Sequence, residues 1–354
     1  MENISKGKLL NTKLLGAADD AFNYYGRWRR GPVTVSINSG AMVEFAYTGN
    51  RCELLFEVDG FTHYPVIYVQ TDNGSIEKTL LSRTTTTVAI HAPYNGVFDE
   101  KAPFQKVCSA CHMVRWWVAS HSLYQTEATG KQWTTLVGGC KFKGVILEDA
   151  GELVPLPYGT RQIEFLGDSL TQGLRLLYTG RDADTEQQIP YANWPQLVAD
   201  LLGLKPIVTG FGGQGLTTAG TCGAPPSRLA FPWIYHEVPW VSLVQPEVVV
   251  IYQGINDNVE APLFQEKYQE FLRLIREWYP ATRIFAICPH NQGRYAAAIR
   301  SAVSPMNDPN IHFLDYSAGV IAPCDTSDGC HLNPGGAVRL GLRLSMDIRR
   351  DSAS

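Results

Sequence analysis

The sequence predicts two domains, a jelly-roll-like antiparallel β-sandwich over residues 1–155 and an α/β domain with a parallel sheet over residues 156–354. Three observations support this fold class. The 354 residues exceed what a single hydrophobic core usually holds. Apolar residues alternate with period two up to about residue 150, whereas strands alternate with amphipathic helices after it. Between the two patterns, residues 151–160 contain two prolines and two glycines, which is typical of a linker.

The first domain is predicted from short β segments separated by turn residues. Val33 to Ile37 alternates cleanly and is followed by the turn Asn38-Ser39-Gly40. Further segments of this kind cover residues 43–47, 52–58, 66–70 and 85–90. Period-two patterning with a turn roughly every 8 to 12 residues is typical of an antiparallel sandwich or a jelly roll.

The second domain is predicted from the regular succession of apolar strands and amphipathic helices. The strands are expected at 163–166, 206–208, 247–252, 283–288 and 311–315, and the helices at 190–202, at 263–278 and from Asn333 onward. Asn333 is a good N-cap, and Pro334 suits a first helical turn. Such alternation indicates a parallel sheet covered on both faces, with functional residues at the carboxyl ends of its strands.

The composition excludes several classes of partner. A net charge of −4 gives no basic footprint for nucleic acid or for an anionic membrane. No apolar run approaches the roughly 18 residues that a membrane span requires. Residues 1–22 lack the apolar core of a signal peptide, which indicates the cytoplasm, or a secreted protein if the numbering begins after signal removal.

No cofactor and no metal are expected. Residues 210–215 lack both the Lys-Ser/Thr of a phosphate loop and the dinucleotide glycine spacing. Cys108, Cys111 and His112 have the spacing of a c-type haem attachment site, but residues 113–118 that follow are typical of a strand, so neither haem nor zinc is expected. Cys324 and Cys330 could pair in an oxidising compartment, although two free thiols are the favoured interpretation.

Four short segments carry the candidate chemistry. Gly167-Asp168-Ser169-Leu170 ends an apolar strand and places a hydroxyl beside free backbone N–H groups, where an acyl-transfer nucleophile is useful. The other three are Gly210 to Gly215 after a short strand, Gly254-Ile255-Asn256-Asp257 after the strongest strand, and Asp328-Gly329-Cys330-His331 near the C-terminus.

Serine, glycine, asparagine and histidine in this order resemble the four blocks of the SGNH (GDSL) hydrolases, over roughly residues 160 to 350. The resemblance implies a flavodoxin-like α/β domain and a serine esterase without cofactors. Ser169 would be the nucleophile, His331 the base and Asp328 the residue that orients the imidazole, with Asp325 as a possible substitute.

An oxyanion hole would complete this site. Its donors would be the backbone N–H of Ser169, that of Gly213 and the side-chain amide of Asn256, with Gly210 and Gly212 as alternates for Gly213. Asn256-Asp257 could instead be an ordinary turn. Asp168 and Asp257 are expected to brace loops, and His236 and His290 to be structural or surface residues.

A β-sandwich placed before an SGNH domain resembles carbohydrate esterase family 2, whose members remove acetyl groups from plant polysaccharides and sugars. The resemblance implies an acetyl esterase on xylan-type or mannan-type carbohydrate or acetylated sugars. Trp194, Trp233 and Trp240 are the candidate sugar platforms, each weighed against an ordinary core role, and residues 178–188 are expected to shape the rim of the pocket. Two alternatives stay open, a generic carboxylesterase or arylesterase on short acyl esters and a carbohydrate-binding protein with an inactive site.

Overall fold

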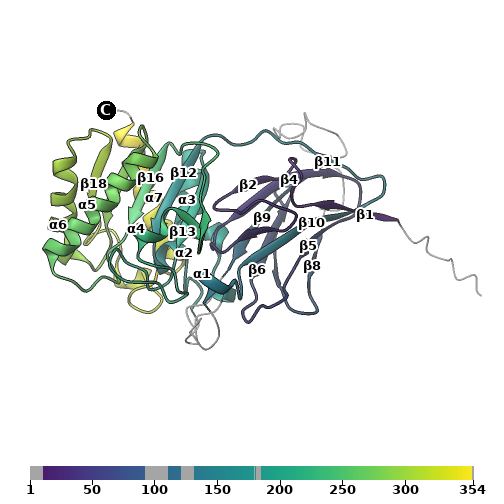
Figure 1. The fold of residues 1–354 in the computed structure, drawn as a ribbon, viewed down its shortest axis with the longest axis horizontal. Coiled ribbons are helices and arrows are strands. Elements are labelled where there is room, and N and C mark those ends of the chain that lie inside the picture. Colours follow the sequence, from purple (N-terminus) through teal and green to yellow (C-terminus); the bar gives the residue numbers. More distant parts are fainter. Residues whose placement is uncertain (1–10, 92–110, 121–130, 179, 181–184, 353–354) are drawn as a thin grey trace, which may run out of the picture.

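The computed structural model describes residues 11–91, 111–120, 131–178, 180 and 185–352. Figure 1 shows two parts side by side along the longest axis, a β-rich N-terminal part in purple to teal and an α/β C-terminal part in teal through green to yellow. The two-domain fold class is therefore confirmed. The boundary proposed between residues 155 and 156 lies in the segment between strands β11 and β12 and stays a prediction.

The N-terminal part contains two antiparallel sheets. One sheet has the order β1-β10-β5-β8, with β3 also paired to β10: β1 Thr12–Gly16, β3 Thr34–Ser36, β5 Cys52–Phe56, β8 Thr87–Ile90 and β10 Cys140–Glu148. The other has the order β11-β4-β9-β6-β7, with β2 paired to β4: β2 Asn23–Tyr25, β4 Met42–Thr48, β6 Val66–Thr71, β7 Ile76–Leu80, β9 Cys111–Ala119 and β11 Leu153–Val154.

Aromatic side chains fill the core of this sandwich. Phe22, Phe45, Trp116 and Phe142 are all nearly inaccessible to solvent. The Phe22 ring meets Phe45 edge to face at a centroid distance of 5.2 Å and Phe142 at 5.4 Å. Each buried aromatic side chain removes a large apolar area from water, and the edge-to-face contacts add to that gain.

The C-terminal part is built on one parallel sheet in the order β13-β12-β16-β17-β18. Its strands are β12 Gln162–Gly167, β13 Lys205–Gly210, β16 Val248–Tyr252, β17 Arg283–Cys288 and β18 Ile311–Asp315. In chain order this is 2-1-3-4-5, the flavodoxin-like arrangement that was expected.

Helices cover both faces of this sheet, because successive side chains of its strands point to opposite sides. Val248 and Val250 belong to a core with Trp194 and Leu340, whereas Val249 and Ile251 pack with residues of the opposite face. The longer helices are α3 Trp194–Leu202 and α7 Pro334–Asp351 on the first face, and α5 Ala261–Trp278 and α6 Ala296–Val303 on the second. No helix in the described part of the chain is both long and apolar enough to cross a membrane.

The helix expected at 190–202 is divided in two. A 3₁₀ turn covers Pro190–Ala192, and α3 begins only after Asn193, whose side chain accepts the N–H of Trp194 as an N-cap. The short elements are α1 Gln132–Thr135, α2 Ser169–Gln172, α4 Ser227–Ala230, β14 Trp233–Tyr235, β15 Val238–Pro239 and the 3₁₀ turns Thr185–Gln187, Gly293–Tyr295, Ser304–Met306 and Pro323–Asp325.

A fully buried ion pair joins the two parts. Arg27 follows β2, and its Nη2 lies 2.7 Å from Oε1 of Glu164, which is in the middle of β12. Nη1 of Arg27 donates to the carbonyl oxygens of Phe231 and Trp233 at 2.6 and 2.9 Å. A buried charge is tolerated only when it is paired and hydrogen-bonded, and Oε1 of Glu164 meets both conditions through Nε and Nη2 of Arg27.

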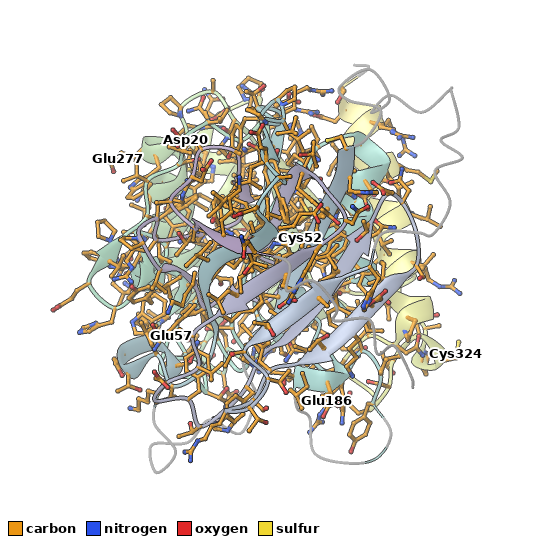
Figure 2. The ribbon with its side chains drawn as sticks, turned by 90° about the vertical axis from the view of Figure 1, so that its right-hand side faces the viewer. Asp20, Cys52, Glu57, Glu186, Glu277 and Cys324 are labelled. Carbon is orange, nitrogen blue, oxygen red and sulfur yellow. The ribbon has the colours of Figure 1, made fainter. Side chains whose placement is uncertain are left out.

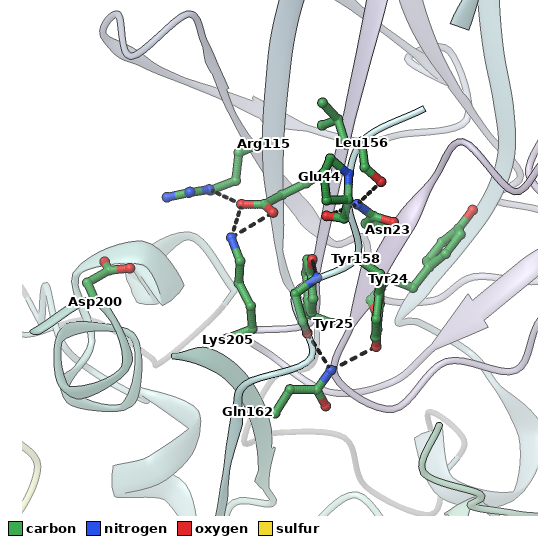
Figure 3. Close-up of polar contacts among 12 residues, drawn as sticks. Asn23, Tyr24, Tyr25, Glu44, Arg115, Leu156, Tyr158, Gln162, Asp200 and Lys205 are labelled. Carbon is green, nitrogen blue, oxygen red and sulfur yellow. Dashed lines mark hydrogen bonds and ion pairs between the residues drawn. The ribbon is translucent and has the colours of Figure 1, made fainter. Parts of the chain in front are cut away.

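A second polar cluster lies at the same interface (Figure 3). The Glu44 carboxylate accepts from Nε of Arg115 at 2.7 Å and from Nζ of Lys205, on β13, at 2.7 to 2.8 Å. Nearby, Nε2 of Gln162 donates to the Tyr158 hydroxyl at 2.9 Å, and the Tyr158 ring stacks on that of Tyr25. The sandwich is therefore fixed against the edge of the parallel sheet that β13 forms.

The Arg27–Glu164 pair gives a stability prediction. Arg27→Met should lower the free energy of unfolding by about 3–5 kcal/mol, because it leaves the Glu164 charge buried without its partner. Arg51→Met, which removes an exposed pair with Glu53, is the control and should cost at most about 1 kcal/mol. Chemical denaturation measures both, and equal effects of the two substitutions would contradict the structural role of Arg27.

Candidate functional site

Three neighbouring strands end together and deliver the first three sequence blocks to one edge of the sheet. Gly167, the last residue of β12, is in register with Gly210 of β13 and with Tyr252 of β16. The chain then continues into Ser169, Gly213 and Asn256 respectively. The carboxyl edge of a parallel sheet is where such folds place their ligands.

The turn that carries Ser169 is tightly packed. Asp168 is the N-cap of α2, its Oδ1 accepts the N–H of Leu170 at 3.0 Å, and Ser169 is the first helical residue. At Gly210, a Cβ atom would lie 2.6 Å from the backbone nitrogen of Gln172 and 2.7 Å from the carbonyl oxygen of Asp168. The end of β13 can therefore approach this turn so closely only because residue 210 is a glycine, and Gly210 packs directly against the turn.

His331 connects the serine to a carboxylate. Its Nε2 lies 3.0 Å from Oγ of Ser169, and its Nδ1 lies 2.8 Å from Oδ2 of Asp328. A carboxylate can only accept, so Nδ1 carries the proton, and the unprotonated Nε2 faces the serine hydroxyl. This tautomer lets His331 remove a proton from Ser169.

Asp328 is held in place from both sides. Oδ1 accepts the backbone N–H groups of Cys330 and His331 at 3.1 and 2.8 Å, and Oδ2 accepts from Nη1 of Arg175 at 2.5 Å. Burial alone would raise the pKa of Asp328, but the hydrogen bonds from Arg175 and His331 together keep it well below its usual range. The carboxylate therefore stays ionised at any working pH.

Asp325 lies apart from His331. Its Oδ2 lies 2.9 Å from Nε of Arg339 and accepts the backbone N–H of Ala322 at 2.8 Å. Of the two acidic candidates, the structure therefore brings only Asp328 to the imidazole.

Burial lowers the pKa of His331, the hydrogen bond and charge of Asp328 oppose that change, and the positive charge of Arg175 adds to the lowering.

His290, expected from the sequence to be structural, lies beneath the same loop. Its Nε2 donates to the carbonyl oxygen of Cys330 at 2.8 Å, while Nδ1 receives the hydroxyl of Tyr252 at 3.0 Å. His290 therefore supports the backbone immediately before His331.

The predicted oxyanion donors surround the serine turn. In the described residues, no protein acceptor is recorded for the N–H groups of Ser169 and Gly213, whereas the N–H of Gly212 donates to Oε1 of Gln172 at 3.0 Å. Gly213 has φ +73°, a conformation that favours glycine. Of the two neighbouring glycines, Gly213 is thus the one with an available donor.

Asn256 presents its amide to the same region. Nδ2 donates to the carbonyl oxygen of Gln214 at 2.9 Å and makes a longer contact of 3.4 Å with Oδ2 of Asp168. The first bond fixes the amide, and the weaker contact leaves the second N–H available to a ligand.

Burial, with a smaller contribution from Asp257, raises the pKa of Asp168 to about 7, although the hydrogen bond from the Leu170 N–H opposes it.

Two of the three predicted sugar platforms are corrected by the structure. Trp194 is fully buried in the core and donates its Nε1–H to the carbonyl oxygen of Leu170. Trp240 is 7% exposed and packs between the domains, close to Arg27. Neither ring can stack on a sugar, because both faces are covered. Trp233 is 36% exposed, and its role stays a prediction.

Arg175, in the turn after α2, contributes to the site although no local pattern in the sequence predicted it. Arg175 lies against Asp328, and the Tyr178 ring lies 4.9 Å from the Arg175 guanidinium carbon. No motif marks Arg175, since an arginine six residues after a serine is unremarkable without the fold.

The described cysteines that the sequence singled out lie on a strand or are free thiols. Cys111 and His112 lie on β9, as the strand pattern predicted, and Nδ1 of His112 bonds Oδ2 of Asp72; Cys108 lies outside the described residues. Cys324 and Cys330 are free thiols. Figure 2 shows Cys52 among the sandwich strands and Cys324 at the edge of the molecule. Within the described ranges, no three His, Cys, Asp or Glu side chains gather as metal ligands.

Comparison with known proteins agrees with this fold. Residues 165–338 match the model of the GDSL-like lipase/acylhydrolase family, and no curated protein matches the chain. Three solved structures are similar over most of their length. A family two carbohydrate esterase from Clostridium thermocellum in complex with cellohexaose has a TM-score of 0.74 and 19% identity, covering 94% of this chain and 99% of that one.

The second is a family two carbohydrate esterase from Cellvibrio japonicus, with a TM-score of 0.76, 18% identity and coverage of 96% and 98%. The third is an acetyl xylan esterase from the rumen bacterium Butyrivibrio proteoclasticus, with a TM-score of 0.76, 15% identity and coverage of 96% and 99%. Residues 165–338 thus form a hydrolase domain of the GDSL type, which supports an ester hydrolase. The two-domain fold of the whole chain resembles that of carbohydrate esterase family 2 structures.

The geometry separates the two acidic candidates by experiment. Asp328→Asn should lower kcat/KM by on the order of 10²–10⁴-fold, because the amide no longer holds the required imidazole tautomer. His331→Ala should cost more, since it removes the base itself. Asp325→Asn is the matched control from the same loop and should leave kcat/KM close to that of the unmodified protein. A large loss in Asp325→Asn with little effect of Asp328→Asn would transfer the orienting role to Asp325.

Proposed function

We propose that this protein is a serine esterase that removes O-acetyl groups from carbohydrate through an acyl-enzyme intermediate. The observation that carries the proposal is the continuous contact from Asp328 through His331 to Ser169. A bare serine hydroxyl is a weak nucleophile, and a positioned imidazole is what makes it useful.

The first half of the reaction forms the acyl-enzyme. Oγ of Ser169 attacks the acetyl carbonyl carbon while Nε2 of His331 takes the hydroxyl proton. The negative charge that develops on the carbonyl oxygen is stabilised by the N–H groups of Ser169 and Gly213 and by the Asn256 amide. The imidazolium then returns its proton to the sugar oxygen, which leaves as an alcohol.

The second half releases acetate. A water molecule gives a proton to Nε2 of His331 and attacks the acetyl-serine carbonyl, and the same donors stabilise the second tetrahedral intermediate. Ser169 then leaves with the proton from the imidazolium. Asp328 keeps its negative charge throughout and stabilises the positively charged imidazole in both halves.

The carbohydrate part of the proposal is supported by the solved structures and by the way in which the sandwich holds the segment after α2. One similar structure carries cellohexaose, and another is an acetyl xylan esterase. In this chain, side chains and backbone of the sandwich hold residues 185–188 through hydrogen bonds. The Thr185 hydroxyl donates to the carbonyl oxygen of Tyr64, and Nζ of Lys78 donates to that of Glu186. Gln188 accepts from the hydroxyls of Ser39 and Tyr68.

This segment is connected to the catalytic side. The carbonyl oxygen of Gln187 accepts the N–H of Leu177 at 3.0 Å, and Leu177 lies two residues after Arg175. The sandwich thus supports the turn that carries Arg175, and we infer that the alcohol part of the ester lies on this side of the site. This role suits a carbohydrate esterase better than an enzyme for small esters.

Replacing the nucleophile tests the reaction. Ser169→Ala should lower kcat on an aryl acetate by on the order of 10⁴–10⁶-fold and leave the thermal midpoint nearly unchanged, since only one oxygen atom is lost. Ser345→Ala, at a buried serine of α7, is the control and should keep full activity. Turnover above roughly a tenth of the wild-type value in Ser169→Ala would refute the assignment.

Acyl preference tests the substrate class. We expect kcat/KM to fall from aryl acetate to butyrate and octanoate, because each methylene that does not fit costs roughly 1–3 kcal/mol of transition-state binding. Acetate should also be released from acetylated xylan. Faster turnover of octanoate, or no acetate from any sugar ester, would favour the generic carboxylesterase. No turnover of any ester would favour a carbohydrate-binding protein with an inactive site.

A further inference from the structure

We propose that Arg175 is a positioning residue of this site and that, by sharing Oδ2 of Asp328 with His331, it extends the enzyme's activity to lower pH. The inference rests on the proposed esterase function for its consequence, but the contact itself can be tested without turnover. Two donors meet on one carboxylate oxygen, Nη1 of Arg175 at 2.5 Å and Nδ1 of His331 at 2.8 Å.

The backbone indicates that this arrangement is specific. Arg175 has φ +56°, in the left-handed region that a residue with a side chain adopts at an energetic cost. The turn is closed by the N–H of Tyr178, which donates to the carbonyl oxygen of Arg175 at 3.0 Å. The Tyr178 ring lies 4.9 Å from the guanidinium carbon of Arg175. The guanidinium is therefore fixed by an aromatic ring and a carboxylate together.

The direction of the effect follows from the charges. The neutral form of His331 is the active base, and the protonated form carries a positive charge close to that of Arg175. Arg175 also partly neutralises the negative charge of Asp328, which would otherwise stabilise the imidazolium of His331. Both effects favour the neutral imidazole. Removing the Arg175 charge should therefore raise the pKa of His331 and move the acid limb of kcat/KM to higher pH.

Other titratable groups face His331, and among them Asp328 is the one whose charge Arg175 shares through a hydrogen bond. Asp328 stays on its two backbone N–H donors. His290 lies beneath the loop, and burial lowers its pKa, so it stays neutral. Burial raises the pKa of the Cys330 thiol to about 11, so it too stays neutral. Asp168, with a pKa of about 7, lies before the nucleophile and adds the same contribution to the profile of every variant.

Three substitutions of Arg175 form the test. Arg175→Gln removes the charge, and Arg175→Gly removes it while suiting the left-handed backbone, so that at least one charge-free variant should fold normally. Arg175→Lys keeps the charge. The matched control is Arg339→Gln, which removes the arginine from Asp325, the other carboxylate of the same loop.

Two readouts are measured, the pH profile of kcat/KM on an aryl acetate and the proton NMR titration of the His331 ring. In the two charge-free variants we expect the acid limb and the NMR midpoint to move together to higher pH. Arg175→Lys should restore much of the wild-type position, and Arg339→Gln should not change it.

An unchanged NMR midpoint in a folded charge-free variant would overturn the inference, as would an equal shift in Arg339→Gln. A shifted midpoint in a protein that hydrolyses no ester would contradict the proposed function while leaving the Arg175–Asp328–His331 coupling intact. The two hypotheses therefore fail in different experiments.

Discussion

The register of the parallel sheet is the constraint on which the candidate site depends. Because Gly167 is paired with both Gly210 and Tyr252, three strands end at one level, and the residues that follow them converge without a long loop. His331 comes from a separate loop near the C-terminus, held by His290 below it and by Asp328 beside it. Each reacting group is thus fixed by regular structure or by at least one buried hydrogen bond, which is how precise geometry is maintained at low cost in flexibility.

The sandwich and the α/β part are joined by buried polar contacts. The guanidinium of Arg27, from the sandwich, pairs with the carboxylate of Glu164 in the centre of β12. Among the described residues, no other ion pair with Glu164 is present. Residues 185–188 continue the connection on the other side, toward Leu177 and the turn that bears Arg175. A perturbation of the sandwich has a physical route to the Asp328 carboxylate through these contacts.

Much of the fold could be predicted from local patterns. Period-two alternation identified the sandwich strands, and the apolar runs that precede Ser169, Gly210 and Gly254 marked strands of the parallel sheet. The serine, glycine, asparagine and histidine blocks were found because each sits next to a strand or a helix cap, where local sequence and local structure agree. Asn333 illustrates this, since its side chain caps α7 as the sequence indicated.

What could not be predicted depends on contacts between residues that are distant in sequence. Trp194 was expected as a sugar platform, but its position on the inner face of α3 buries it completely. Arg175 is separated from Asp328 by 153 positions, and nothing local marks either its left-handed backbone or its partner. Burial and long-range pairing come from the packed structure, so sequence patterns carry little information about them.

Active-site labelling tests the central claim most directly. A diethyl aryl phosphate transfers its phosphoryl group to a serine that has been activated by a neighbouring base, and intact-mass analysis followed by peptide mapping identifies the modified residue. The account predicts one diethylphosphoryl group per chain, on the peptide that contains Ser169, with loss of esterase activity in proportion. It also predicts that His331→Ala is labelled far more slowly. Labelling of another residue as activity is lost, or equal labelling of His331→Ala, would contradict it.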